Sequence, residues 1–496
     1  MNDTDLDTLV HTFCDGRTPG KQDFNASKMY SLLEEPFTLW CSFHAPADQA
    51  VYESNRYEVM KVRSDRRSRD EWIRTQYPQA VFISAQEEAD RFTQTLQQMA
   101  AGASAIVDGV LWNLPNNIYG GVNLLVREDT APSRFGPYHY RLCQFKRAHD
   151  LKEHYALQVC LLNKILAAIQ QYTPEAVCVY LKGRTEQVNY LSHTERLSNE
   201  LDFWRNIRDG IAQPEAHKPP KAASAPWRIY ANKLLFQTHD LQLLPELSAQ
   251  MRQCLKICGI RSIDDVAATP IDTLRTILEE PYATHAYCTA QAYVHQKPVL
   301  REAGCFPPPV KKRNLYFDFE ATEIFGKDNS SFVYLIGIWD KEEDKYVRFV
   351  ARTAEQEIDI FEQFYHYVAD FENTILYHWT DYEVRKMRKM ASAHPEHAEH
   401  LHALCNCCYD LKVAVNRAFY LPAPSFSLKA AAPAFGFQWR QDDCGAMDSM
   451  VYFNNWLKTG DDELLNKILI YNEDDCKAML YLENKLKEST VIQVPL

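Results

Sequence analysis

The sequence predicts a multidomain α/β protein whose last domain is built on a mixed β-sheet, and three observations lead to this prediction. The 496 residues are too many for one ordinary hydrophobic core, and usual domain sizes suggest about three domains. Residues 213–226, rich in proline, alanine and lysine, lack hydrophobic periodicity and are typical of a linker. In the last block, predicted strands come first and then alternate with helices, the order expected of a mixed sheet with helices on its faces.

The composition is typical of a soluble, globular, cytoplasmic protein. Hydrophobic residues make up 46% of the chain and charged residues 24%, and no run of about 18 apolar residues predicts a membrane span. The polar, acidic start does not have the pattern of a signal peptide. The 14 cysteines lack the spacing of a disulfide framework, so we expect reduced thiols. The net charge of −12 leaves nucleic-acid binding open, because an acidic enzyme can carry a local basic track.

Two breaks divide the chain into an N-terminal domain (1–212), a linker (213–240), a helical module (241–306) and a C-terminal domain (307–496). In the helical module, two apolar-periodic stretches flank Gly259, which predicts a helix-hairpin-helix unit. Such hairpins can grip a nucleic-acid backbone through amides near the turn, but a hairpin that serves only for packing is an equal alternative.

The C-terminal domain opens with an apolar stretch, NLYFDFE at 314–320, that carries two carboxylates. In a strand, Asp318 and Glu320 point to one face while Phe317 and Phe319 point to the other. Two like charges held this close raise each other's pKa unless a cation lies between them. The spacing therefore predicts half of a Mg²⁺ or Mn²⁺ site. The alternative is an exposed edge strand on which both carboxylates face solvent.

Further acidic residues follow other predicted elements of the same block. The predicted strands are 331–339, 345–351 and 373–379, and the last runs out into HWTDYE, which places Asp381 and Glu383 where a strand end meets a helix start. Near the C-terminus, residues 468–482 have apolar positions at helical spacing, and Tyr471 and Asp475 share a face because they are four residues apart. Alternatively, Tyr471 belongs to the core and Asp475 forms a cap or a local pair.

These stretches, DFE, HWTDYE and YNEDD in this order, resemble the three motifs of the DnaQ-like (DEDD) 3′-to-5′ exonucleases of the RNase H-like superfamily, in the tyrosine (DEDDy) subclass. The resemblance implies that Asp318, Glu320 and Asp475 are metal ligands and that Tyr471 orients the attacking water. Glu383 stands where the family has an aspartate, and it is the implied fourth ligand. Further candidate site residues are His378, Asp381, as an alternative second-motif ligand, and Asp474.

The implied activity is metal-dependent hydrolysis of phosphodiester bonds from the 3′ end of single-stranded DNA or RNA. Four carboxylates can hold two Mg²⁺ or Mn²⁺ ions about 3.5–4 Å apart, of which one activates water and the other stabilises the leaving oxygen. Two alternatives stay open. One is a non-catalytic adaptor that binds nucleic acid or a helicase, and the other is a phosphodiesterase that acts on small nucleotides.

The N-terminal domain resembles the restriction-endonuclease-like (PD-(D/E)xK) nucleases of the RecB type. The stretches VDGVL, YGGVNLLVR and YRLCQFKR, followed by a helix that begins near residue 151, carry the likeness. Asn123 replaces the family's aspartate, Gln144 replaces its acidic residue, Lys146 is retained, and Gln158 is followed four residues later by Leu162 in place of a tyrosine. Amides are poor ligands for Mg²⁺. We therefore expect an inactive nuclease domain.

RecB-type nucleases often carry an iron–sulfur cluster, but this chain is not expected to hold one. Cys41 could be the first ligand, yet the later trio of cysteines is absent, and Cys254 and Cys258 have the spacing of core thiols on one helix face. The whole arrangement resembles a bacterial family of RecB-like nucleases that are sometimes joined to helicases, so a helicase is a candidate partner. The sequence leaves the oligomeric state open.

Basic residues mark the surfaces expected to contact nucleic acid. Lysine and arginine neutralise backbone phosphates, although a run of them is often only a solvated face. The predicted phosphate-contacting residues are Arg66, Arg67, Arg69, Lys146, Arg385, Lys386 and Lys429.

Overall fold

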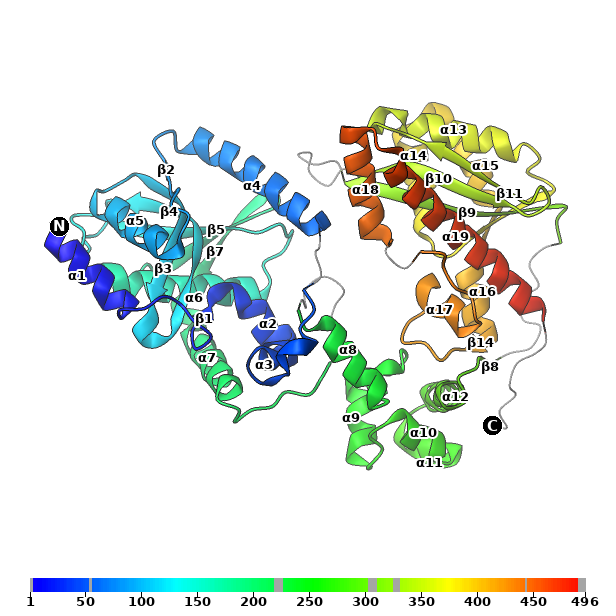
Figure 1. Ribbon diagram of the computed structural model, residues 1–496, viewed down its shortest axis with the longest axis horizontal. Helices are drawn as coiled ribbons and strands as arrows, with labels where there is room; N and C mark the ends of the chain where they lie inside the picture. The colour runs from blue at the N-terminus through cyan, green and yellow to red at the C-terminus, as the bar shows by residue number, and fades with distance from the viewer. Residues whose placement is uncertain are drawn as a thin grey trace. The chain divides into compact units, whose positions relative to one another are not determined.

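The structure is a computed structural model that describes residues 3–52, 56–217, 226–301, 310–323, 331–441 and 444–488. The chain divides into two compact units (Figure 1), which are Met1–Glu53 with Asp65–Leu234, and Ser54–Ser64 with Leu235–Leu496. Each unit has its own β-sheet. Among the described helices, none is both long and apolar enough to cross a membrane.

The N-terminal unit is built on a seven-stranded sheet with the order β2-β3-β4-β5-β6-β7, in which β1 pairs with β4. Strands β3, β4 and β5 form an antiparallel meander, and β6 lies parallel to β5. A parallel pair needs a crossover connection, and helix α6 supplies it. The strands are β1 (Phe24–Asn25), β2 (Val81–Phe82), β3 (Ala105–Asn113), β4 (Ile118–Glu128), β5 (His139–Phe145), β6 (Ala176–Leu181) and β7 (Arg184–Asn189).

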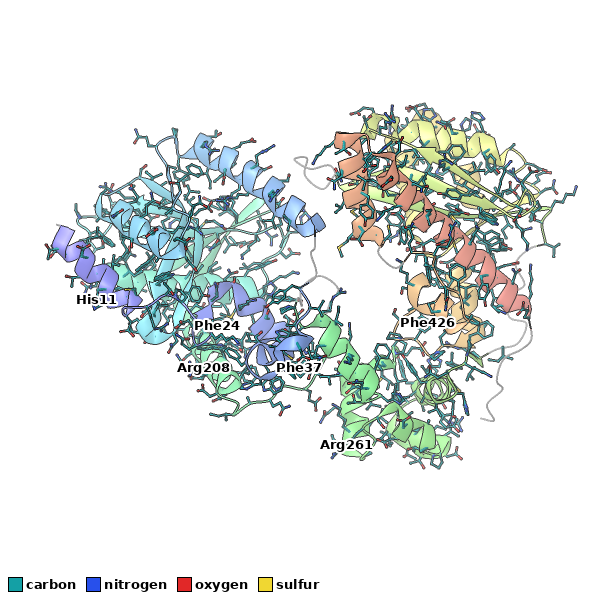
Figure 2. The ribbon with its side chains drawn as sticks, in the orientation of Figure 1. His11, Phe24, Phe37, Arg208, Arg261 and Phe426 are labelled. Carbon is teal, nitrogen blue, oxygen red and sulfur yellow. The ribbon has the colours of Figure 1, made fainter. Side chains whose placement is uncertain are left out.

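Helices cover this sheet and close its core. Every residue of β3 is buried, and most of α6 is buried as well. Phe24 of β1 contacts Trp204 of α7 at 5.3 Å between ring centroids, and Phe37 stacks on Trp40 within α3. Phe24 and Phe37 are labelled in Figure 2. The helices of this part of the chain are α1 (Asp3–Cys14), α2 (Met29–Glu34), α3 (Pro36–His44), α4 (Arg56–Gln76), α5 (Glu88–Ala100), α6 (Glu153–Gln170) and α7 (Thr194–Arg208).

The predicted linker at 213–240 contains helix α8 (Arg228–Gln237). Ala231 of this helix and the preceding Trp227 are buried in a small cluster with Phe37 and Cys41 of α3. Residues 218–225 of the predicted linker lie outside the described residues. The segment that follows 225 is therefore packed structure and not a free connection.

In the helical module, two helices flank Gly259. Helix α9 (Ala249–Ile257) ends just before Gly259, whose φ of +85° is a conformation that glycine adopts without strain, and α10 begins at Ile263. The amides of Arg261 and Ser262 donate to the Asp265 carboxylate, so these two donors of the turn are already used inside the protein. The remaining elements are α10 (Ile263–Ala268), α11 (Ile271–Ile277), α12 (Tyr282–His295) and β8 (Val299–Leu300).

The C-terminal sheet has the order β11-β10-β9-β12-β13. Strand β9 lies antiparallel to β10 and parallel to β12, so the sheet is mixed, as the sequence predicts. The four predicted strands of this block all form. The strands are β9 (Arg313–Glu323), β10 (Ser331–Asp340), β11 (Lys345–Val350), β12 (Thr374–His378) and β13 (Cys408–Asp410), and β14 (Phe419–Tyr420) pairs with β8 outside this sheet.

Helices pack on both faces of this sheet because β9 alternates two kinds of side chain. Phe317 and Phe319 enter one core together with Phe361 and Phe364 of α13. Tyr316 enters the opposite core, to which α19 contributes. The helices are α13 (Glu357–Val368), α14 (Tyr382–Ala393), α15 (Ala398–Asn406), α16 (Leu411–Ala418), α17 (Leu428–Ala434), α18 (Ala446–Thr459) and α19 (Asp462–Lys487).

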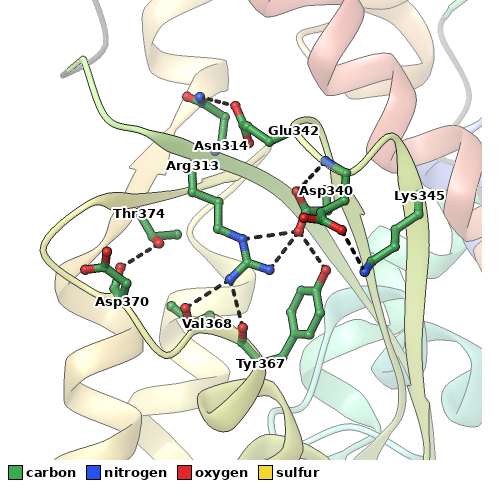
Figure 3. Close-up of polar contacts among 10 residues, drawn as sticks. Arg313, Asn314, Asp340, Glu342, Lys345, Tyr367, Val368, Asp370 and Thr374 are labelled. Atoms are coloured by element: carbon green, nitrogen blue, oxygen red, sulfur yellow. Dashed lines mark hydrogen bonds and ion pairs between the residues drawn. The ribbon is translucent and has the colours of Figure 1, made fainter.

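Arg313, the last residue of the basic stretch and the first residue of β9, anchors the sheet. Its guanidinium donates to Asp340 of β10 at 2.7 Å and to the carbonyl of Tyr367 at 2.9 Å (Figure 3). The Tyr367 hydroxyl also donates to Asp340. Burial by itself would raise the pKa of Asp340, but the hydrogen bonds from Tyr367 and Arg313 hold that pKa below its usual value. The Arg313 side chain therefore ties β9, β10 and α13 together.

Candidate metal centre of the C-terminal domain

Three carboxylates from two elements meet at one point of the C-terminal domain. Asp318 and Glu320 lie on β9 and share one face, and Asp475 lies on α19, which packs against β9. One oxygen from each of the three lies within 4.8 Å of the others. Oxygen donors at this spacing can hold a hard divalent cation. Asp475 lies more than 150 positions after Asp318 and Glu320 in the sequence, so the packing of α19 creates the cluster.

Glu383, and not Asp381, turns inward from the second motif. Glu383 is buried on the first turn of α14, and its charge contributes to raising the pKa of Asp318. Asp381 is exposed and pairs with Arg385 one turn later, at 3.0 Å. His378 is buried with its Nδ1 against the carbonyl of Thr380 and 3.9 Å from Glu383. Of the two alternatives left by the sequence, Glu383 is therefore the buried residue and Asp381 the exposed one.

Burial and mutual repulsion make this cluster costly in its ionised form. Burial is the largest cause of the raised pKa of Asp318, and the charges of Asp475, Glu320 and Glu383 add to it. Burial likewise raises the pKa of Glu320 to about 8, of Glu383 to about 7 and of Asp475 to about 6. A cation among these groups would favour their ionised forms. The donor set therefore fits a divalent metal ion.

Tyr471 lies one turn before Asp475 on α19 and is also buried. Burial, together with the negative charges of Asp475, Glu320 and Asp318, raises the pKa of its hydroxyl far above the usual value. The hydroxyl therefore stays protonated at neutral pH. The Lys429 ammonium lies over the Tyr471 ring, 4.3 Å from its centroid, and donates to the carbonyl of Cys444.

The structure also identifies residues around the cluster that the sequence reasoning missed. Asn472 donates to Asp318 at 2.9 Å, Ser449 donates to Glu320 at 2.7 Å, and the Trp439 indole donates to Asp475 at 2.6 Å. Each of these bonds fixes the rotamer of one carboxylate. No local sequence pattern predicts the contacts of Asn472, Ser449 or Trp439, because each one depends on packing between elements.

Gly337 of β10 makes the position of Asn472 possible. It lies opposite Asp318 in the β9–β10 ladder. A Cβ atom built at Gly337 would lie 1.6 Å from Oδ1 of Asn472, which itself accepts a hydrogen bond from Tyr346. Only a residue without a side chain lets α19 approach the sheet so closely.

Comparison with known families assigns this part of the chain. Residues 315–487 match the family model of the RNase H superfamily. This segment is an RNase H superfamily domain. The domain contains all four carboxylates and Tyr471, and the N-terminal unit lies outside the match.

A solved family B DNA polymerase from the hyperthermophilic archaeon Pyrobaculum calidifontis is similar at 19% sequence identity, with a TM-score of 0.29. The similarity covers 38% of this chain and 25% of the polymerase chain, so the chain spans only a minor part of that protein. No curated protein matches the chain.

Asp474, a further candidate from the third motif, faces away from the RNase H domain's carboxylate cluster. Its carboxylate accepts hydrogen bonds from the backbone amide and Nε of Arg440, at 2.8 and 2.7 Å. Arg440 also pairs with Glu473. Asp474 therefore fastens the segment before α18 to α19, and this segment carries Trp439.

Several predicted phosphate contacts are engaged inside the protein. Lys386 is buried and donates to Ser331, close to Glu357. In the N-terminal unit, Arg69 is largely buried and pairs with Asp108, which also binds Arg66. This placement does not match the open surface expected of Lys386 and Arg69. The more exposed predicted residues are Arg66, Arg67, Arg385 and Lys429.

Asn123 and Gln144, the two amides at the predicted nuclease site of the N-terminal unit, form internal hydrogen bonds. Asn123 of β4 accepts from the amide of Phe145, and Gln144 of β5 donates to the carbonyl of Gly121. Lys146 donates to Gln158 of α6 at 2.5 Å. Burial lowers the pKa of Lys146 to about 8. The side chains that would form a nuclease site thus bond to one another or to the backbone.

Proposed function

We propose that the C-terminal RNase H domain is a metal-dependent 3′-to-5′ exonuclease that shortens single-stranded DNA or RNA. The observation that carries this proposal is the convergence of Asp318, Glu320 and Asp475, with oxygens within 4.8 Å of one another, beside the buried Tyr471. Glu383 completes a set of four buried or half-buried carboxylates. A structural role alone would not favour this many unneutralised carboxylates at one point.

The donor set fits Mg²⁺ or Mn²⁺, which prefer hard anionic oxygens. Asp318, Glu320, Glu383 and Asp475 would hold two such ions. Bound there, the ions would supply Lewis acidity for phosphodiester hydrolysis.

The chain's own residues would orient the reactants. Tyr471 keeps its proton at neutral pH, so it would position the attacking water by hydrogen bonding and would not act as a base. Lys429 is exposed beside Tyr471 and would contact a substrate phosphate. Trp439, Ser449 and Asn472 would keep the carboxylates in their rotamers, in the way that outer hydrogen bonds orient metal ligands.

The decisive experiment compares the full-length protein with its Asp318→Ala variant on 5′-labelled single-stranded DNA and RNA. Each reaction contains Mg²⁺ or Mn²⁺, and a parallel reaction contains chelator. We expect a ladder that shortens from the 3′ end with the wild-type protein and is lost in the variant and in chelator. The ladder also shows which sugar is preferred.

Other outcomes would redirect the assignment. Equal cleavage by Asp318→Ala would refute the proposed site. Retained binding of both strands with no cleavage would favour a non-catalytic adaptor, and cleavage limited to dinucleotides would favour a phosphodiesterase of small nucleotides. A pull-down with a candidate helicase tests the partner that the adaptor function requires.

For the N-terminal unit we propose a restriction-endonuclease-like domain that no longer cleaves. Support comes from Asn123 and Gln144, which bond to backbone groups within the sheet, because an amide so engaged is a poor ligand for Mg²⁺. The unit would then hold nucleic acid or a protein partner. In the assay above, Asp318→Ala should remove all cleavage, and any residual metal-dependent activity would assign catalysis to the N-terminal unit.

A further inference from the structure

A second cluster of potential metal ligands lies in the C-terminal domain, apart from the carboxylate site. It joins Glu362 of α13, His397 at the start of α15, and His400 on the first turn of α15. Helices α13 and α15 pack together (Figure 1). They cover the face of the sheet that receives Phe317 and Phe319, opposite to the face of Asp318 and Glu320. The two clusters therefore do not share ligands.

The atoms of this cluster converge from three side chains. Nδ1 of His397 lies 3.0 Å from one Glu362 oxygen, and Nδ1 of His400 lies 2.9 Å from the other. All three ligand atoms lie within 4.8 Å of one another. Ligand atoms of a tetrahedral zinc ion are about 3.3 Å apart, given bond lengths of about 2.0–2.1 Å. The side chains therefore need only small rotations to close around an ion.

The surroundings also suit a bound ion. The side chains of Glu362, His397 and His400 are 20%, 31% and 34% exposed, so an ion can enter from solvent. The Tyr365 ring stacks on His400 at 3.9 Å and limits its rotation. His366, one turn after Glu362 on α13, has its Nε2 3.9 Å from a Glu362 oxygen and can approach as a fourth ligand.

We propose that Glu362, His397 and His400, with His366 as the fourth ligand, bind a transition-metal ion such as Zn²⁺. Three imidazoles and one carboxylate are a donor set that suits zinc, whereas Mg²⁺ and Ca²⁺ prefer oxygen ligands alone. The ion would link α13 to α15 behind the sheet that carries the catalytic carboxylates. This proposal is independent of the exonuclease activity.

The competing interpretation is a metal-free set of hydrogen bonds and ion pairs between Glu362 and its histidines. The two interpretations predict different visible absorption when Co²⁺ is added, because four-coordinate Co²⁺ absorbs visible light far more strongly than six-coordinate Co²⁺. Sulfur ligands would add a near-ultraviolet charge-transfer band. The probe thus separates this cluster from the carboxylate site and from three described cysteines, which are Cys405 in α15 and Cys407 and Cys408 just after it.

The test uses full-length protein in the Asp318→Ala background, which weakens the carboxylate site. Three variants are titrated with Co²⁺ and then with Zn²⁺ as competitor. They are His397→Ala/His400→Ala, Glu362→Gln and the control His402→Ala, whose side chain is exposed on the same helix and outside the cluster. Glu362→Gln retains hydrogen-bonding capacity and is expected to fold. It therefore shows whether metal binding is lost even when the fold is kept, which the double alanine variant alone does not show.

We expect strong visible bands without a sulfur band in the parent and in His402→Ala, and displacement of Co²⁺ by Zn²⁺. The double alanine variant should lose these bands, and Glu362→Gln should bind more than about 100-fold more weakly, beyond the loss typical of an outer partner. In a thermal scan, Zn²⁺ should raise Tm in the parent and in His402→Ala only. Absence of the bands in the parent, their persistence in the double variant, or a sulfur band would overturn the proposal.

Discussion

Replacing Gly337 with alanine should disable the carboxylate cluster without touching any carboxylate. Gly337 faces Asp318 across the ladder, and its missing side chain leaves room for Asn472 of α19. The new Cβ would lie 1.6 Å from Asn472 Oδ1, and real Cβ contacts essentially never fall below 3.0 Å. Asn472 must therefore move by more than an ångström, and with it the hydrogen bond that holds Asp318 at 2.9 Å.

The size of the effect follows from these contacts. Forcing an extra methyl group into a packed interior costs about 1–3 kcal/mol, and losing a hydrogen bond to a charged group costs about 1.5–3 kcal/mol. Because both concern one contact, we expect a loss of about 3 kcal/mol in stability, or roughly 6–12 °C in Tm for a unit of this size. A displacement of about 1 Å at a reacting centre can cost about 100-fold in rate, so cleavage should fall at least that far.

The assay is single-turnover cleavage of 5′-labelled single strands, paired with a thermal scan of each variant. Gly121→Ala is the matched control, because it also lies on a strand and its Cβ would meet only the Gly109 carbonyl at 3.9 Å. The double variant Gly337→Ala/Asn472→Ala tests whether the clash with Asn472 causes the loss of cleavage, because most of the clash is gone without the Asn472 side chain. It should cleave no more slowly than Asn472→Ala alone.

A Gly337→Ala variant with wild-type cleavage and Tm would refute this reasoning. It would mean that α19 can retreat from the sheet without disturbing Asp318. A double variant that is much slower than Asn472→Ala would place the damage elsewhere, for example at the Tyr346 hydroxyl, which lies 2.6 Å from the same Cβ position.

Two further predictions concern the second motif and the N-terminal unit. Glu383→Ala should lower cleavage more than about 100-fold, because it removes a proposed metal ligand and not merely an outer partner. Asp381→Ala should cleave at the wild-type rate, because Asp381 is exposed and paired with Arg385. The opposite result would make Asp381 the ligand. Lys146 has a folded-state pKa of about 8 against an ordinary 10.5, so the unfolded chain binds more protons between these values and the folded state gains stability as pH rises from about 8 to 10.5. The gain is at most about 3 kcal/mol, and Lys146→Met should lose it in urea unfolding at pH 8 and pH 10; equal pH dependence in both proteins would contradict the shift.

The sequence by itself predicted those features that depend on local periodicity. The alternation of Phe317, Asp318, Phe319 and Glu320 sets which side chains share a face, because strand geometry repeats every two residues. The C-terminal strands and the mixed sheet follow from the same kind of pattern, and the structure confirms both. The superfamily of the C-terminal domain, which the motif order indicated, is confirmed for residues 315–487. The assignment of the N-terminal unit stays a prediction.

Only the tertiary structure decided which side chains meet across elements. The sequence left Asp381 and Glu383 as alternatives, because they lie two residues apart and the packing of α14 determines which one is buried. The sequence also could not show that the Lys386 side chain is buried and donates a hydrogen bond to Ser331.

The same limit applies to the supporting contacts. Asn472 and Ser449 lie far from Asp318 and Glu320 in the sequence, and they meet these carboxylates only because α18 and α19 pack on the sheet. Gly337 lies opposite Asp318 because β9 pairs with β10. The Glu362 and His400 cluster likewise depends on how α13 lies against α15. Periodicity fixes directions within one element, whereas distances between elements depend on the packing of the whole core.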